Sequence, residues 1–114
     1  MDSISKSDID KSFGKVFREY RDKHSLTQEQ LSEKIGISVK FISRVENGSS
    51  GVKPSTLINY INELGITPNI LYRDLIDNES VKSQIEISEK ISTLSDEKIA
   101  FLNAIIDLIK TLDS

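Results

Sequence analysis

The chain of 114 residues contains no cysteine, no tryptophan and a single histidine. Without cysteine, neither a disulfide nor a thiolate metal site can form, and one histidine leaves no catalytic or zinc constellation to assemble. Long apolar runs are also missing, because no stretch reaches the roughly 20 residues that span a bilayer. The opening MDSISKSDIDKSF is too polar for a signal peptide. We therefore expect a cytoplasmic chain without metal, cofactor or enzymatic activity.

Positive charge is scarce over the whole chain, where 15 basic residues stand against 18 acidic ones and give a formal net charge of −3. The distribution is uneven. Between Lys11 and Lys53, nine Lys or Arg residues stand against five Asp or Glu, whereas residues 75–114 hold four basic and eight acidic residues. The first segment suits contact with phosphates, although a bias of this size is also typical of an ordinary solvated surface.

The segment 27–47, TQEQLSEKIGISVKFISRVEN, has the pattern of two short helices joined by a glycine turn. Thr27 and Gln30 have the spacing of a capping box at the start of the first helix. Gly36 stands where a tight turn requires a positive φ, and Ser38 is suited to cap the second helix.

The second of these helices is amphipathic. Its apolar arc, which we expect in the core, consists of Phe41, Ile42 and Val45. The opposite arc suits bases and phosphates and comprises Val39, Lys40, Ser43, Arg44 and Asn47. The pattern predicts a helix that enters the major groove of DNA. The alternative is an amphipathic helical hairpin in an ordinary small bundle.

Residues from about 9 to about 74 resemble the phage-repressor helix-turn-helix family, also called the Xre type. The resemblance rests on FGKVFREYRDKHSLTQEQLSEKIGISVKFISRVENG, followed by PSTLINYINELGITPNILY. It implies an all-α fold with a five-helix, lambda-repressor-like DNA-binding domain. It also implies a sequence-specific regulator that works as a dimer on two-fold-related operators.

The resemblance further implies roles for individual residues. The residues expected to read base edges are Val39, Lys40, Ser43 and Arg44. The residues expected to contact phosphates are Thr27, Gln28 and Asn47, to which we add Lys53 at the end of the following loop. The resemblance also implies a structural ion pair between Arg21 and Glu46, and the place of Glu46 at the border of the apolar arc suits a partly buried partner.

Apolar periodicity sets the expected organisation of the remaining chain. A first helix over about 8–23 places three aromatic residues in the core, namely Phe13, Phe17 and Tyr20. A fourth helix is expected to begin at Pro54, to end at Gly65 and to turn inward Leu57, Ile58, Ile61 and Leu64. We assign 8–74 to the DNA-binding domain, 75–79 to a linker and 80–114 to a C-terminal helical segment.

The C-terminal segment contains a helix of moderate regularity at about 80–92 and a last helix capped by Ser95. The apolar arc of the last helix is wider than the arc of about 100° that a surface helix buries on one neighbour. Its members are Phe101, Leu102, Ile105, Ile106, Leu108, Ile109 and Leu112. We expect this helix to form a hairpin with the preceding one and to dimerise with a second copy. The alternative is packing on its own domain.

The function predicted from these features is that of a homodimeric transcriptional regulator, a repressor, that binds palindromic double-stranded DNA through the helix Ser38–Asn47. Two other classes stay open. One is an antitoxin-type regulator whose C-terminal helices bind a toxin or antagonist protein. The other is a protein-interaction module that does not bind DNA, and Lys40 and Arg44 on the groove-facing arc argue against it.

Overall fold

The computed structural model describes residues 3–112, which form seven α-helices and one short 3-10 helix, with no β-strand in that range. The chain divides into two compact units, with the boundary between Asp77 and Asn78. Within the described range, no helix is long and apolar enough to cross a membrane. The all-α fold expected from the sequence is confirmed.

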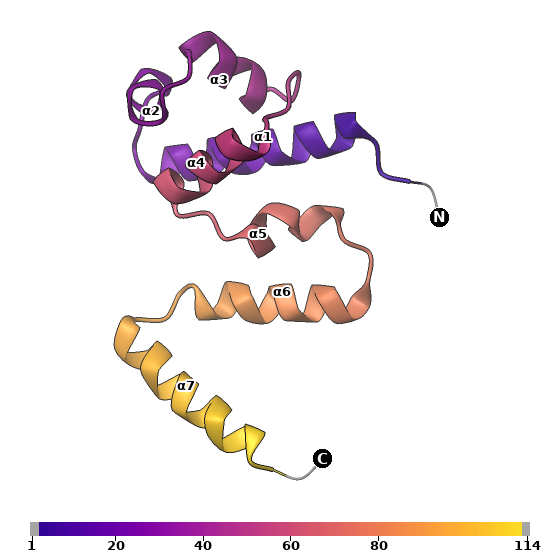
Figure 1. Cartoon of the computed structure of the whole chain (residues 1–114), viewed down its shortest axis with the longest axis vertical. Helices are drawn as coiled ribbons and strands as arrows, with labels where there is room; N and C mark the ends of the chain where they lie inside the picture. The colour runs from indigo at the N-terminus through magenta and orange to yellow at the C-terminus, as the bar shows by residue number, and fades with distance from the viewer. Residues whose placement is uncertain (1–2, 113–114) are drawn as a thin grey trace. The chain divides into compact units, whose positions relative to one another are not determined.

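The first unit holds five α-helices and the 3-10 helix (Figure 1). Their bounds are α1 Lys6–Lys23, α2 Gln28–Ile35, α3 Val39–Glu46, α4 Pro54–Leu64, α5 Pro68–Tyr72 and η1 Arg73–Leu75. The long helix α1 packs against α3, α4 and α5, while α2 packs against α3 and α4. The five-helix module expected at 8–74 is therefore present, with η1 added at its end.

Local signals in the sequence set the ends of these helices. Gly36 and Gly65 end α2 and α4 in the left-handed conformation, at φ values of 72° and 65°. Helix α1 begins two residues before the expected position, because the Ser5 hydroxyl accepts a hydrogen bond from the Asp8 amide at 3.1 Å. Each of these ends follows from contacts within a few residues, which explains why the sequence predicts them well.

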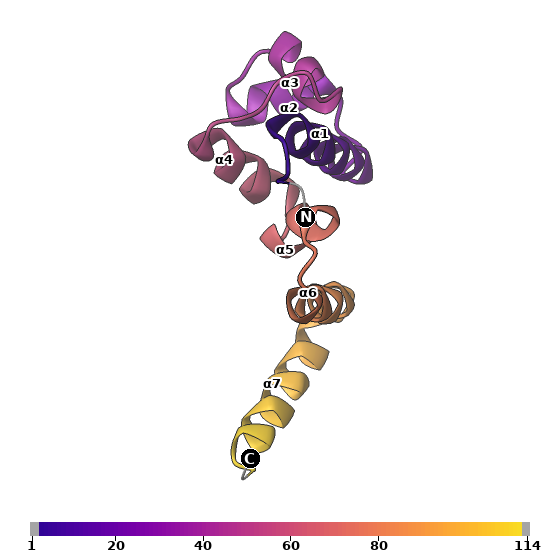
Figure 2. The same ribbon diagram turned by 90° about the vertical axis from the view of Figure 1, so that its right-hand side faces the viewer.

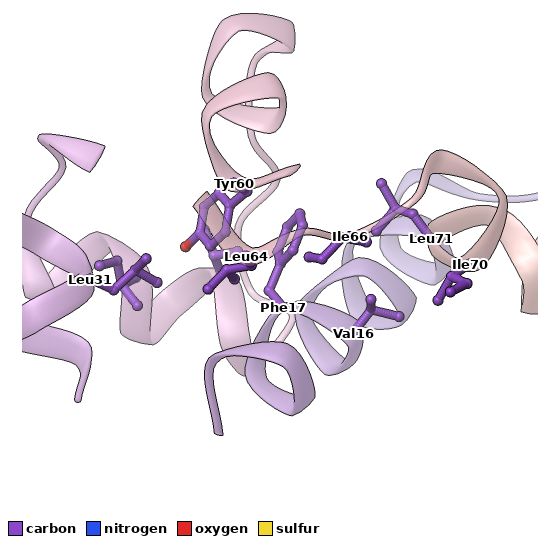
Figure 3. Packing of buried hydrophobic residues seen from close by; sticks show 10 residues of the cluster. Val16, Phe17, Leu31, Tyr60, Leu64, Ile66, Ile70 and Leu71 are labelled. Atoms are coloured by element: carbon purple, nitrogen blue, oxygen red, sulfur yellow. The ribbon is translucent and has the colours of Figure 1, made fainter. Parts of the chain in front are cut away.

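The core of the first unit is built around a pair of aromatic rings. Phe17 of α1 stacks on Tyr60 of α4, with 4.1 Å between the ring centroids and 18° between the planes. Aliphatic residues from α1, α2, α4 and α5 surround the pair (Figure 3). The predicted aromatic residues Phe13 and Tyr20 are partly buried and pack against this cluster.

Helix α4 differs from the prediction at Ile58, which is 56% exposed. Tyr60 and Leu64 are fully buried and Thr56 is 6% exposed, so these residues define the inward face. A residue two positions from Tyr60 points to the opposite side, since an α-helix has 3.6 residues per turn. The prediction placed Ile58 in the core because it is apolar, but packing of the Tyr60 ring decides which side faces inward.

The second unit contains α6 Glu79–Ile91 and α7 Asp96–Lys110. Asn78 caps α6 by accepting a hydrogen bond from the Val81 amide at 3.1 Å. Leu75 belongs to η1 and Glu79 to α6, so the segment 75–79 that was expected to be a linker is helical at both ends. Ser95 caps α7 as expected, because its hydroxyl accepts from the Lys98 amide at 3.3 Å.

The closed hairpin that we expected from α6 and α7 is not formed by the described residues of a single chain. The two helices diverge from the turn at 92–95 (Figures 1 and 2), and no residue of α7 is buried. In α6, Ile85 is 4% exposed, whereas Val81 and Ile87 are exposed. The apolar side of α7 consequently lies open.

Candidate nucleic-acid interface

Helix α3 has one side fixed in the core. Ser38 caps the helix, since its hydroxyl accepts a hydrogen bond from the Phe41 amide at 3.1 Å. Ile42 and Val45 are 0% and 1% exposed, and Phe41 is partly buried against the same cluster. Burial of these three residues, which the sequence predicted, orients the opposite side of α3 towards solvent.

The solvent side of α3 carries the residues that were expected to read bases. Lys40, Ser43 and Arg44 are exposed, and Val39 is half-buried. The Arg44 guanidinium lies 5.8 Å from the centroid of the Phe41 ring, a cation–π contact that steadies the side chain. Within residues 3–112, the side chains of Lys40 and Ser43 have no hydrogen-bond or ion-pair partner. Their donors are therefore available to a ligand.

The C-terminal end of α3 presents Asn47. Its side-chain oxygen accepts a hydrogen bond from the Ser49 amide at 3.0 Å, which leaves the NH2 group free to donate. The Ser49 hydroxyl donates to the Arg44 carbonyl at 3.2 Å and closes the turn. Lys53, the residue that precedes α4, is exposed. Among the described residues, the Asn47 NH2 group and the Lys53 ammonium have no acceptor, so both can donate to an anion.

The start of α2 presents the two other residues expected at phosphates. Thr27 and Gln30 form the predicted capping box: the Thr27 hydroxyl accepts from the Gln30 amide at 3.0 Å, and Gln30 Oε1 accepts from the Thr27 amide at 2.8 Å. The Thr27 O–H can still donate. Gln28 is half-buried, and its Nε2 donates to Glu46 Oε1 at 3.2 Å, which leaves one N–H for a ligand.

A buried ion pair joins the elements that carry these residues. Arg21 Nε donates to Glu46 Oε2 at 2.7 Å and Nη2 donates to Glu46 Oε1 at 2.9 Å, while Nη1 donates to the Leu26 carbonyl at 2.7 Å. The side chains are 11% and 4% exposed. Donation of these hydrogen bonds to the Glu46 carboxylate raises the pKa of Arg21 above its ordinary value. The pair links α1 to the end of α3 and, through Gln28, to the start of α2.

A close crossing of α1 and α3 was not foreseen from the sequence. A Cβ atom on Gly14 would collide with the carbonyl oxygen of Val45 and lie 3.1 Å from that of Glu46. The backbone of α1 therefore touches the last turn of α3. A glycine inside a helix is about 1 kcal/mol less favourable than alanine. The presence of a glycine at position 14 of a predicted helix was therefore the signal in the sequence that indicates a close helix crossing.

The comparisons with known proteins agree with this architecture. Residues 17–71 match the helix-turn-helix family. A stretch of 47 residues is 47% identical to the HTH-type transcriptional repressor RghR of Bacillus subtilis (strain 168), and the match covers 40% of this chain and 35% of that repressor. The chain thus spans about a third of the length of the curated relative it matches.

A solved structure supports the fold at lower sequence identity. The chain is similar to the crystal structure of the clp gene regulator ClgR from Corynebacterium glutamicum, with a TM-score of 0.50 and 20% identity, over 91% of this chain and 89% of that one. The family match contains the whole of α2, α3 and α4. The segment 17–71 is therefore a helix-turn-helix domain, and part of the chain is similar to part of a transcriptional repressor.

Proposed function

We propose that this protein is a sequence-specific DNA-binding regulator that inserts α3 into the major groove. One observation carries the proposal: on the open side of α3, the donors of Lys40 and Ser43 have no partner within residues 3–112. Thr27 and Asn47 flank this side with further free donors. Groove-facing donors between two phosphate-binding ends are the arrangement by which a recognition helix docks.

The chemistry of the α3 residues defines what each one would recognise. The Arg44 guanidinium would bond guanine O6 and N7, and the Lys40 ammonium would bond the same acceptors. The Ser43 hydroxyl can donate or accept, and the apolar Val39 suits a thymine methyl group. Contacts with the phosphates would fix the position of the protein on the duplex, and the residues that would make them are Thr27, Gln28, Asn47 and Lys53.

We further propose that two copies pair through α7. Phe101, Leu108 and Leu112 are 69%, 67% and 70% exposed, and a continuous apolar surface of this kind marks an interaction site. Asp96 and Glu97 lie in the first turn and Lys110 in the last. Antiparallel pairing of two α7 helices would place each acidic end beside the Lys110 of the other and would oppose the helix dipoles.

A two-fold assembly also fits the DNA. A dimer would present two α3 helices to half-sites about 34 Å apart on a palindromic operator, and doubling the contacts offsets the small cationic charge of one copy. The repressor named among the similar proteins favours repression. Since both similar proteins are bacterial, we place the regulator in the cytoplasm with the chromosome.

The proposal is tested by selecting bound duplexes from a random pool with the full chain at low salt. On the selected site, Arg44→Ala should weaken binding by about 1–3 kcal/mol, because a bidentate contact to a base is lost. Binding to random duplexes should change much less. Lys90→Ala, which removes an equal charge from an exposed position of α6, serves as the control.

Two results would contradict the proposal at different levels. Equal losses on selected and random duplexes for Arg44→Ala would show that this residue contacts only the backbone. Failure of the wild-type protein to enrich any duplex would reject DNA recognition itself.

A further inference from the structure

The middle of α1 carries cations that the α3 interface does not use. Lys11, Lys15 and Arg18 are exposed, and none of the three has a side-chain ion pair or hydrogen bond within residues 3–112. Their spacing of i, i+4 and i+7 places them along one side of the helix. Lys11 and Lys15 precede the region 17–71 that matches the family. We call these three residues the α1 cationic stripe.

Three other cations of the first unit already have an acidic partner. Lys6 pairs with Asp10 at 2.7 Å, Lys34 pairs with Glu63 at 3.4 Å, and Arg21 is held by Glu46. The Lys6 pair matters for the α1 cationic stripe, because it neutralises the carboxylate one residue before Lys11. Lys11 and Lys15 are like charges four residues apart, a spacing that disfavours a helix slightly, so an external anion near these two ammonium groups is favourable.

Lys11 lies directly beside the end of α3. A Cβ atom on Gly48 would come within 2.8 Å of Lys11 Cγ and 3.0 Å of Lys11 Cα. Gly48 has a φ of 82° and follows Asn47, the residue that ends α3. An open hollow of the surface is lined by the first turns of α1 and by residues 47–49. The stem of Lys11 is therefore packed against the turn that also presents Asn47.

We infer that the α1 cationic stripe is a second phosphate-binding surface, which contacts the duplex backbone beyond the half-site, on the side where Asn47 meets it. The inference rests on the proposed function, since α3 must first place the protein on DNA. A lysine whose stem is already packed loses less conformational entropy when its ammonium meets a phosphate. Lys15 and Arg18 extend the same surface along α1.

The salt dependence of binding tests this inference. Each phosphate contact contributes about 0.9 to the slope of log affinity against log salt concentration. Raising the salt from about 50 to about 200 mM should therefore weaken Lys11→Ala less than the wild-type protein, by about 3.5-fold for each bound copy of the chain and about 12-fold for a dimer. The triple variant of Lys11, Lys15 and Arg18 to alanine should show a larger change, whereas Lys11→Arg should keep the wild-type slope.

Two duplexes locate the contact. One carries the selected site with long flanks, and the other is trimmed to the bases that α3 reads. The alanine variants should differ from the wild-type protein on the long duplex and match it on the trimmed one. Lys90→Ala controls for the loss of one charge, and thermal unfolding checks that the variants are folded.

The outcomes separate this inference from the proposed function. An unchanged salt slope for both alanine variants on the long duplex would overturn the second surface while leaving DNA recognition by α3 intact. Equal changes on both duplexes would overturn its flanking position. Failure of the proposed function would already be seen with the wild-type protein, which would then select no duplex.

Discussion

At the scale of single residues, Tyr60 stands out because its hydroxyl group is buried without a hydrogen-bond partner in the described part of the chain. Its ring stacks on Phe17 and belongs to the core. Burial raises the pKa of Tyr60 well above its ordinary value, and the negative charge of Glu46 adds to the increase. The hydroxyl thus contributes little to stability, while the ring contributes packing.

Tyr60→Phe should consequently leave stability at pH 7 unchanged or raise it by up to about 1–3 kcal/mol, the cost of a buried unpaired polar group. Because the pKa is raised in the folded protein, the folded state retains this proton more strongly than the unfolded state. The free energy of unfolding that comes from this difference in pKa is fully present below pH about 10, the ordinary tyrosine pKa. It is lost as the pH rises further and Tyr60 ionises more easily in the unfolded chain.

Urea unfolding at pH 7 and pH 11 measures both effects. The wild-type protein should lose more stability over this interval than Tyr60→Phe, in which Tyr20 and Tyr72 remain as internal controls. A variant that is clearly less stable than the wild-type protein at pH 7 would show that the hydroxyl has a partner.

At the scale of helices, the sequence predicts what local contacts determine. The capping-box residues Thr27 and Gln30 are only three positions apart, and the buried side of α3 follows from its own periodicity. Contacts between distant segments were not predictable in this way. The hydrogen bond from Gln28 to Glu46 and the outward position of Ile58 both depend on where another helix lies. A local sequence pattern therefore does not predict them.

The crossing of α1 and α3 gives a prediction at the same scale. In most helices, replacing glycine with alanine stabilises by about 1 kcal/mol. Gly14→Ala should instead destabilise the first unit by about 1–3 kcal/mol, because its Cβ would collide with the Val45 carbonyl and neither backbone can easily move. DNA binding should fall as well, since the end of α3 would shift.

Chemical denaturation measures the change, and Glu19→Ala, at an exposed position of the same helix, controls for helix propensity. A Gly14→Ala variant as stable as the wild-type protein would mean that α1 and α3 do not touch at this point.

At the scale of the whole molecule, the two units differ in how they bury apolar residues. The first unit surrounds an aromatic pair with aliphatic side chains, whereas α7 has no buried residue within the described part of the chain. An exposed apolar face on a helix marks an interaction site that a second molecule can bury. The recognition surface and the proposed pairing surface therefore lie in different units, so each can be altered without the other.

This separation gives the prediction for assembly. Replacing Ile105 and Ile109 together with glutamate should abolish the dimer, because four carboxylates would meet in an apolar interface. The first unit should remain folded. Asn103→Glu adds a carboxylate at an exposed position of α7 on the side away from the apolar residues, so it should leave the dimer intact.

Sedimentation equilibrium distinguishes these states, and the orientation of the helices can be tested in the same experiment. If the pairing is antiparallel, Lys110→Glu should weaken the dimer, and Glu97→Lys in the same chain should restore it, because each end faces the opposite end of the partner.

Dimers that persist after the double glutamate replacement would reject α7 as the pairing surface. A wild-type protein that is monomeric at every concentration would instead assign the open side of α7 to a different protein, as in the antitoxin-type alternative.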